Sequence, residues 1–197
     1  MNTASLRRRG YKKKEDGIVL PAGYTLGTYA RVRAGWHIYL STLASPYSVE
    51  CLIDPATNTN YSAIIFGNGT FDWGIAIKTV DDKNKPALPY SKEVSAVEET
   101  FLTPGTPRLV EASEGIYTVD GINTGLSPQL KSYPRAFAGT SNGNYAIDAK
   151  IYYLKIYKDG ECIHHYVPVI NPELKARMYD LIAEEEISCN VGYINVY

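Results

Sequence analysis

The pattern of hydrophobic and polar positions is clearest between Arg135 and Ile170, in RAFAGTSNGNYAIDAKIYYLKIYKDGECIHHYVPVI. Strand-forming residues lie on both sides of Asp159-Gly160. An Asp-Gly pair between two such runs is typical of a hairpin with a type I′ turn, because that turn needs positive φ at both central residues. The stretch therefore predicts two long β-strands joined by a tight turn. The strand formers are Ile151, Tyr152, Tyr153, Ile156, Tyr157, Ile163, Tyr166, Val167 and Val169.

Shorter hydrophobic stretches precede this hairpin. In WHIYL, Trp36, Ile38 and Leu40 alternate with His37 and Tyr39. Alternation with a period of two predicts a strand with one buried face, so we expect His37 to lie on the exposed face.

Two more strand pairs are predicted in the middle of the chain. YSAIIFG and FDWGIAI read as strands linked at Gly67-Asn68-Gly69, and Asp120-Gly121 within IYTVDGINTG predicts a second hairpin. Residues 79–108 hold four prolines and many charges, so we expect a long irregular region there with a short strand around Val94–Val97.

One segment near the end of the chain has two interpretations. In NPELKARMYDLIAEEEIS, Leu174, Met178, Leu181 and Ile182 recur at helical spacing. The alternative is a strand at Arg177–Leu181, a turn, and another strand from Ile187.

The segments together predict an all-β protein with about ten to twelve short strands and at most one helix. That count indicates an antiparallel two-sheet β-sandwich with jelly-roll connections. No internal repeat appears, which argues against propellers and β-helices. With 197 residues, we expect a basic N-terminal arm at 1–16 and a single domain at 17–197.

Charge separates the arm from the domain. Residues 7–14 carry six positive charges: Arg7, Arg8, Arg9, Lys12, Lys13 and Lys14. Residues 1–16 hold six basic and two acidic residues, and the remainder holds 14 basic and 19 acidic residues, a net charge of −5. The arm reads either as a solubilising tail or as a docking segment whose Leu6 and Tyr11 add anchoring contacts. Nucleic acid is a poor partner, since the domain offers no basic face.

Cysteine and hydropathy patterns limit the remaining classes. Three scattered cysteines, Cys51, Cys162 and Cys189, predict reduced thiols in a cytoplasmic product and no metal site. Nothing resembles a signal peptide, and no apolar run approaches the length that crosses a membrane.

Several pieces, in order, resemble laminin-G-like, concanavalin-A-like jelly rolls in virion proteins of bacteriophages and prophages of gut bacteria of the Bacteroidales type. The most specific is AKIYYLKIYKDGECIHHYVPV, with its Lys-Ile-Tyr run, Asp-Gly turn and closing Val167-Pro168. Ile65-Phe66-Gly67, Tyr117-Thr118-Val119-Asp120-Gly121 and Met178-Tyr179-Asp180 are also similar to family segments, as is the opening ASLRRRG. The chain departs from the family at Ala183-Glu184-Glu185-Glu186, where a glycine-bearing turn is usual.

The resemblance implies a structural virion protein, made in the host bacterial cytoplasm and assembled into the particle. It implies a capsid decoration or auxiliary protein, a head fibre or a tail component. The partners would be capsid, fibre or tail subunits and further copies of the chain, and the basic arm would dock on them. From the motifs and the hydropathy pattern we expect no cofactor and no membrane association.

The sequence lacks the motifs of glycosidases, serine hydrolases and nucleotide-binding enzymes. Glycosidases on such scaffolds carry an E-x-D-x-x-E strand, which is absent, and consecutive glutamates on a strand point to opposite faces. Serine hydrolase, phosphate-loop and dinucleotide motifs are also absent. The adjacent His164 and His165 would face opposite ways on a strand. We therefore expect no catalytic residues.

Glycan binding is the alternative function, as a lectin-like module that attaches the particle to host glycans. Lectin-like sandwiches stack sugars on exposed aromatic rings, assisted by Asp and Asn. The candidate residues are Trp36, Asp72, Trp73, Asn142 and Asn144. Both tryptophans sit in apolar strands, so a role in the core is the competing interpretation, and no motif fixes a calcium site.

Overall fold

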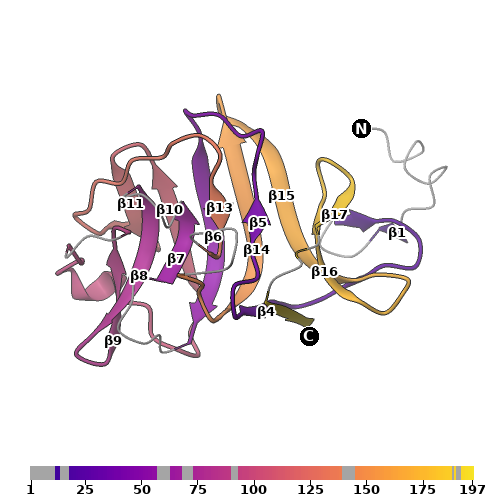
Figure 1. Ribbon diagram of the computed structural model, residues 1–197, viewed down its shortest axis with the longest axis horizontal. Coiled ribbons are helices and arrows are strands. Elements are labelled where there is room, and N and C mark those ends of the chain that lie inside the picture. Colours follow the sequence, from indigo (N-terminus) through magenta and orange to yellow (C-terminus); the bar gives the residue numbers. More distant parts are fainter. Residues whose placement is uncertain are drawn as a thin grey trace.

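The computed structural model describes residues 18–56, 63–67, 73–89, 93–138, 145–187, 189 and 192–197, together with the backbone of 12–13. Within these ranges the regular secondary structure is β-strand apart from one short 3-10 helix, η1 (Glu98–Thr100). The strands pair antiparallel in two main sheets that pack face to face (Figure 1). The predicted all-β, two-sheet antiparallel sandwich is confirmed.

The larger sheet has 11 strands. Its main path is β12-β11-β10-β6-β14-β15-β16-β17, and β3, β4 and β18 attach beside β14 and β15. The bounds are β3 (Thr25–Leu26), β4 (Ala30–Arg33), β6 (Ser48–Pro55), β10 (Arg108–Ser113), β11 (Ile116–Val119), β12 (Ile122–Asn123), β14 (Ala149–Lys158), β15 (Glu161–Ile170), β16 (Ala176–Asp180), β17 (Glu185–Ile187) and β18 (Tyr193–Val196).

The smaller sheet has five strands in the order β5-β13-β7-β8-β9. They are β5 (Ile38–Tyr39), β7 (Ala63–Gly67), β8 (Gly74–Val80), β9 (Lys83–Ala87) and β13 (Arg135–Ala136). A separate two-stranded sheet joins β1 (Lys12–Lys13) to β2 (Val19–Leu20).

The main core lies between the two large sheets. In β6 inner apolar residues alternate with outer ones, and Val49, Cys51 and Ile53 are buried, whereas all five residues of β7 are buried. Phe66 from the smaller sheet and Tyr117 from the larger one are among the largest fully buried side chains. Burial of these apolar surfaces is the main force that holds the sandwich together.

Both predicted Asp-Gly hairpins are confirmed. β14 and β15 are joined at Asp159 (φ +52°) and Gly160 (φ +81°), and β11 and β12 at Asp120 (φ +51°) and Gly121 (φ +77°). Positive φ at both central residues is the requirement of a type I′ turn, whose twist matches that of the flanking strands.

The larger sheet forks between β14 and β15. The two strands pair from the turn only as far as Leu154 and Tyr166. Pro168 of β15 has no N–H to donate to β14. Its carbonyl oxygen accepts a hydrogen bond from the backbone N–H of Gly27 (2.9 Å). Beyond this point β3 pairs with β15, β4 pairs with β14, and β18 pairs with β4.

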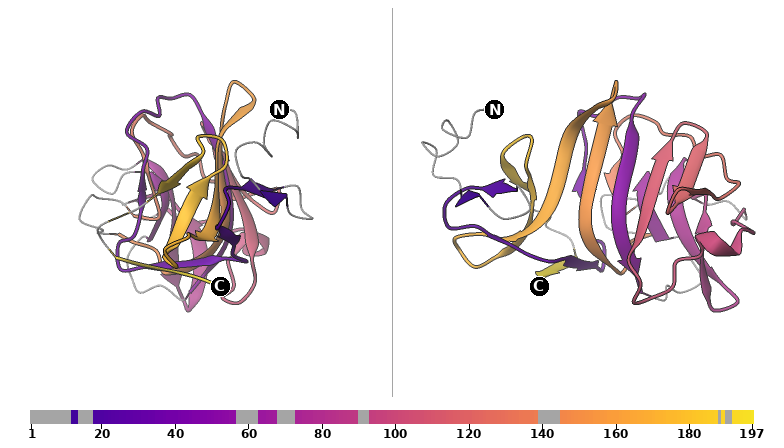
Figure 2. Two further views of the ribbon diagram at one scale, coloured as in Figure 1. Left: turned by 90° about the vertical axis from the view of Figure 1, so that its right-hand side faces the viewer. Right: turned by 180° about the vertical axis from the view of Figure 1, so that it is seen from behind.

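Beyond the fork, β15 and its neighbours form an extension of the sandwich. β16, β17 and β1 lie on the far side of β15 from the smaller sheet (Figures 1 and 2). A second, smaller core holds this extension together, and its buried members are Leu20, Val167, Val169 and Tyr179. The N-terminal strands β2 and β3 therefore belong structurally to the extension.

Four sequence predictions need correction or refinement. Arg135–Ala136 forms β13 in the smaller sheet, so the long strand begins only at Ala149. Residues 83–87, expected to be irregular, form the edge strand β9. Pro86 is tolerated there because its nitrogen faces away from β8, on the side where its carbonyl oxygen accepts a hydrogen bond from Ser95 N (2.8 Å). The strand expected around Val94–Val97 is reduced to one bridge between Val94 and Ala87. At residues 174–187 the strand interpretation, not the helix, is right.

His37 was expected to be exposed, and that prediction is wrong. Its side chain is buried, with 9% of its surface exposed, and Nδ1 lies 2.8 Å from the carbonyl oxygen of Gly35. Strand β5 begins only at Ile38, so His37 lies before the strand and the inward–outward alternation of a strand does not apply to it.

Two glycines face each other across β7 and β8. Gly67 pairs with Gly74, whose φ is +111°. A Cβ at Gly74 would lie 2.3 Å from the carbonyl oxygen of Phe66 and 2.6 Å from the Cα of Gly67. The close approach of the two strands at this point therefore requires glycine.

We expect Gly74→Ala to lower the free energy of unfolding by about 3 kcal/mol, because overpacking and left-handed strain each cost on the order of 1–3 kcal/mol. Gly105→Ala is the matched control, since Gly105 has φ +88° but nothing within 4 Å of its Cβ position. Strain alone should cost the control about 1 kcal/mol. Urea denaturation measures both, and equal losses would contradict the steric explanation.

Candidate functional site

The expected docking arm lies almost entirely outside the described residues. Leu6, Arg7, Arg8, Arg9, Tyr11 and Lys14 all fall there. The backbone of Lys12 and Lys13 is described, and it pairs with Leu20 and Val19. Strand β1 thus joins the arm to the extension.

The expected glycan-binding residues divide into two groups. Asp72, Asn142 and Asn144 lie outside the described residues. Trp36 and Trp73 are buried, with 2% and 4% of their surface exposed, and the Trp36 ring stacks against Phe137. Neither indole ring is available for stacking on a sugar, and the core interpretation is the one that the structure shows for both.

A row of polar side chains instead crosses the outer face of the larger sheet on β6 and β14. Glu50 and Lys155 are paired in register, and the Lys155 Nζ lies 2.9 Å from Glu50 Oε1. The Tyr157 hydroxyl donates to Glu50 Oε2 (2.8 Å), and Tyr153 also hydrogen-bonds to Glu50. Lys155 lies over the Tyr153 ring, 4.8 Å from its centroid.

These contacts fix the charges of the row. Burial by itself would raise the pKa of Glu50, but hydrogen bonds from Lys155, Tyr157 and Tyr153 outweigh it and lower the pKa. Burial likewise acts to lower the pKa of Lys155, and Glu50 raises it overall. The pKa of Tyr153 is raised, first by burial and then by Glu50. Glu50 is therefore charged at neutral pH and hydrogen-bonded by three donors of β14, so its role is to fix these side chains on the outer face of the sheet.

Two further ion pairs lie at the opposite end of β14. Lys150 Nζ is 2.9 Å from Asp54 Oδ2, and the side chain of Asp54 is almost fully buried. The Arg31 guanidinium binds both carboxylate oxygens of Asp148, each at 3.1 Å. The pKa of Arg31 is raised by this hydrogen-bonded pair.

Three tyrosines form a platform beside these ion pairs. Tyr29 stacks on Tyr197, with ring centroids 5.1 Å apart, and tilts against Tyr152 at 5.7 Å. Lys150 lies over the Tyr29 ring (5.4 Å), and Tyr197 is 59% exposed. We call Tyr29, Tyr152 and Tyr197 the tyrosine platform.

A hollow of about 410 Å³ opens at the fork between β14 and β15. We call it the fork hollow. Its lining is mostly apolar and aromatic: Ile18, Leu26, Gly27, Thr28, Tyr152, Tyr153, His165, Val167 and Pro168. Burial is the main cause that lowers the pKa of His165, so this imidazole is neutral near pH 7.

The two adjacent histidines point to opposite sides of β15, as expected. His165 packs edge-on against Tyr153 at the fork hollow, whereas His164 stacks on the buried Tyr166. His164 Nδ1 lies 2.6 Å from Oδ2 of Asp180, a carboxylate with no exposed surface. The backbone N–H groups of His165 and Ile182 donate to the other oxygen of Asp180.

Asp180 ties β15 to the turn after β16. Burial acts to raise its pKa, but the hydrogen bonds from His164, His165 and Ile182 lower it overall. The carboxylate is therefore charged in the folded protein at neutral pH, and its bonds stabilise the extension.

The contact between Cys189 and His37 is not arranged to activate the thiol as a nucleophile. Cys189 Sγ lies 3.6 Å from Nδ1 of His37. The same nitrogen is 2.8 Å from the Gly35 carbonyl oxygen, which can only accept, so Nδ1 carries the proton and cannot take one from the thiol. All three cysteines are among the described residues, and none forms a disulfide.

Comparison with known proteins does not identify the chain. No family model matches it, and no curated protein matches it. Among the described residues, no group of three His, Cys, Asp or Glu side chains is arranged to hold a metal ion. A search of the same residues finds no helix long and apolar enough to cross a membrane.

Sequence reasoning named the tyrosines of β14 as strand formers but not as surface residues. A β-bulge between Ile151 and Tyr153 shifts the register, so the buried residues are Ile151, Leu154 and Ile156 rather than every second one. The break in alternation at IYYL was the available indication that both Tyr152 and Tyr153 leave the core.

We expect Asp180→Asn to lower the free energy of unfolding by about 3 kcal/mol at pH 7, because it removes a buried charge that three donors satisfy. The folded-state pKa lies below the usual value, so the stabilisation is present above about pH 4 and is lost as the pH falls through the folded-state value. The difference between the two proteins should therefore shrink in acid.

Urea denaturation from pH 7 to pH 3 measures this difference. Glu173→Gln is the matched control, because the Glu173–Lys175 ion pair is exposed and should contribute nothing measurable. A difference between the wild type and Asp180→Asn that grows in acid would contradict the assigned charge state.

Proposed function

We propose that the protein is a non-enzymatic structural component of a bacteriophage particle that docks through its basic N-terminal arm. The candidates are a capsid decoration or auxiliary protein, a head fibre and a tail component. The family resemblance described above suggests the particle. The observation that carries the docking role is the charge contrast between six basic residues in positions 7–14 and a domain of net charge −5.

The position of the arm supports this role. Strand β1 pairs with β2, and β2 belongs to the smaller core of the extension. The arm is thus joined to the end of the molecule that carries β16 and β17, away from the smaller sheet (Figures 1 and 2). Docking through this end would leave the β8–β9 end and its loops free to face outward.

A basic segment of this kind binds best to an acidic protein surface. Its affinity would depend strongly on salt, because exposed charges are screened over about 8–10 Å at physiological ionic strength. The domain itself is acidic, so the surface could belong to a capsid, fibre or tail subunit or to another copy of this chain.

Deleting residues 1–14 should abolish incorporation of the protein into particles, because it removes all six basic residues together with Leu6 and Tyr11. Deleting residues 1–5 is the matched control, since that segment holds no charged side chain. Quantitative immunoblots of purified particles give the copy number, and thermal melts show whether each variant folds. Normal incorporation of a folded 1–14 deletion would refute the docking arm.

Glycan binding is the second candidate function, and the tyrosine platform is the observation that favours it. Aromatic faces beside charged and hydroxyl-bearing groups suit the apolar faces and hydroxyls of a sugar ring. The platform offers three such rings next to Lys150 and the Arg31–Asp148 pair. The residues to test are therefore these tyrosines, because changing Trp36 or Trp73 would disturb the core.

If the domain binds glycans, the double variant Tyr152→Ala/Tyr197→Ala should weaken binding at least about tenfold, since each lost aromatic contact costs on the order of 1 kcal/mol. Tyr39→Ala is the control, because Tyr39 is an exposed tyrosine on the smaller sheet. Glycan arrays followed by calorimetry supply the measurement. Binding that survives in the double variant would remove the platform from consideration.

A further inference from the structure

The turn between β15 and β16 holds a leucine in an unusual position. Leu174 is 85% exposed and has φ +60°. The left-handed conformation is strained for a leucine and unstrained for glycine, and asparagine tolerates it well. The chain therefore carries a large apolar side chain where both the conformation and the exposure disfavour it.

The turn is held in this shape by the buried side chain of Asn171. Its Oδ1 accepts hydrogen bonds from the backbone N–H groups of Glu173 (3.1 Å) and Lys175 (2.9 Å). The backbone of Asn171 donates to Lys175 O (3.0 Å) and accepts from Leu174 N (2.9 Å). Four hydrogen bonds within five residues thus fix the conformation of the turn.

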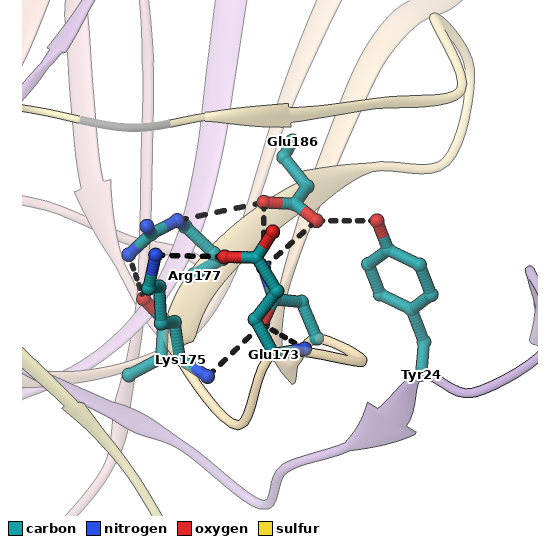
Figure 3. Close-up of polar contacts among 7 residues, drawn as sticks. Tyr24, Glu173, Lys175, Arg177 and Glu186 are labelled. Carbon is teal, nitrogen blue, oxygen red and sulfur yellow. Dashed lines mark hydrogen bonds and ion pairs between the residues drawn. The ribbon is translucent and has the colours of Figure 1, made fainter.

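Glu186 in turn holds Asn171. The Asn171 amide donates to both carboxylate oxygens of Glu186, each at 3.1 Å. Glu186 also accepts a hydrogen bond from the Tyr24 hydroxyl and pairs with the Arg177 guanidinium at 3.4 Å (Figure 3). Burial, followed by this contact with Glu186, raises the pKa of Tyr24 to about 12. The turn is therefore held by Tyr24, which precedes β3, and by side chains of β16 and β17.

The exposed leucine has no role in the fold that explains this support. A strained residue that its surroundings over-determine indicates a function for its side chain. A rigid, pre-formed apolar projection loses little conformational entropy on binding, which is the usual advantage of an interface anchor.

The same chain provides an apolar hollow with room for this projection. The fork hollow has a volume of about 410 Å³, within the range of about 300–1,000 Å³ typical of pockets that hold a whole small molecule, so a leucine side chain fits inside it. Its lining includes Leu26 and Val167, which also pack in the smaller core of the extension. A leucine side chain that entered the hollow would enlarge an existing apolar cluster, with no charged group to desolvate in the lining.

We propose that Leu174 of one molecule inserts into the fork hollow of a second copy of this chain. The projection and the hollow are different surfaces, so the contact is head-to-tail: in a pair, one molecule keeps an unused hollow and the other an unused projection. Head-to-tail contacts build open chains or rings rather than closed symmetric dimers. This proposal does not depend on attachment to a particle.

Sedimentation equilibrium of the full chain over a wide concentration range tests the proposal. The wild type should self-associate, and Leu174→Gly should weaken association about 30-fold or more, as loss of an interface anchor does. Leu174→Gly also relieves the strain, so this variant should fold at least as stably as the wild type. Ile182→Asp, at a 50% exposed position on the neighbouring turn, is the matched control and should associate normally.

A second variant tests the hollow. Thr28 is exposed and lines the hollow, so Thr28→Trp should fill the space without disturbing the core and should also prevent self-association. Mixing Leu174→Gly with Thr28→Trp should restore a 1:1 dimer that grows no further, because one molecule supplies the hollow and the other the projection.

The proposal would be overturned by a monomeric wild type at the highest concentrations, by normal association of Leu174→Gly, or by normal association of a folded Thr28→Trp variant. A mixture of the two variants that stays monomeric would also overturn it, because a head-to-tail contact must be complemented by that pair.

Discussion

The structure depends on the failure of β14 and β15 to remain paired along their whole length. The hairpin begins with a well-formed type I′ turn, and its register holds as far as Leu154 and Tyr166. At Pro168 the strand lacks the N–H that would continue the hydrogen-bond ladder toward β14. The carbonyl oxygen of Pro168 still needs a donor, and Gly27 N supplies it. The chain resolves this by inserting the segment from β3 to β4 into the opening.

The fork determines the rest of the architecture. One branch of the sheet continues through β14 and β6 over the main core, and the other continues through β15, β16 and β17 over the smaller core. The tyrosine platform and the fork hollow lie where the branches separate. The Asp180 and Glu186 networks lie on the second branch, where the buried cluster is small and polar contacts also join the strands.

Local patterns in the sequence predicted the features that local physics decides. Asp159-Gly160 and Asp120-Gly121 predicted two turns because few dipeptides accept positive φ twice, and alternation in WHIYL correctly placed Trp36, Ile38 and Leu40 in the core. The fork could not be predicted in the same way. Its partners come from Thr25–Arg33 and Tyr193–Val196, far from β14 in the sequence, and no local rule indicates which distant segment fills an opening.

The candidate surfaces were missed for a related reason. Tyr29, Tyr152 and Tyr197 lie far apart in the chain, and only the fork brings their rings together. Trp36 and Trp73 are candidates by residue type, because indole rings are common in sugar sites. Both lie in apolar segments, however, and their rings are buried in the core. Leu174 was interpreted as part of a helical period because its positive φ cannot be inferred from residue type.

The closure of the fork by β18 imposes an order in time. Tyr197 exchanges backbone hydrogen bonds with Thr28 and Tyr29, and β18 completes the edge of β4. During synthesis the main hairpin can therefore form, and β3 and β4 can pair beside it, as soon as residue 170 is available, whereas the other edge of β4 stays unpaired until residues 193–197 have left the ribosome. Through that interval β4 is an unprotected strand edge, and edges of this kind pair readily with other chains. Residues 193–197 therefore protect the edge of β4 from pairing with other chains.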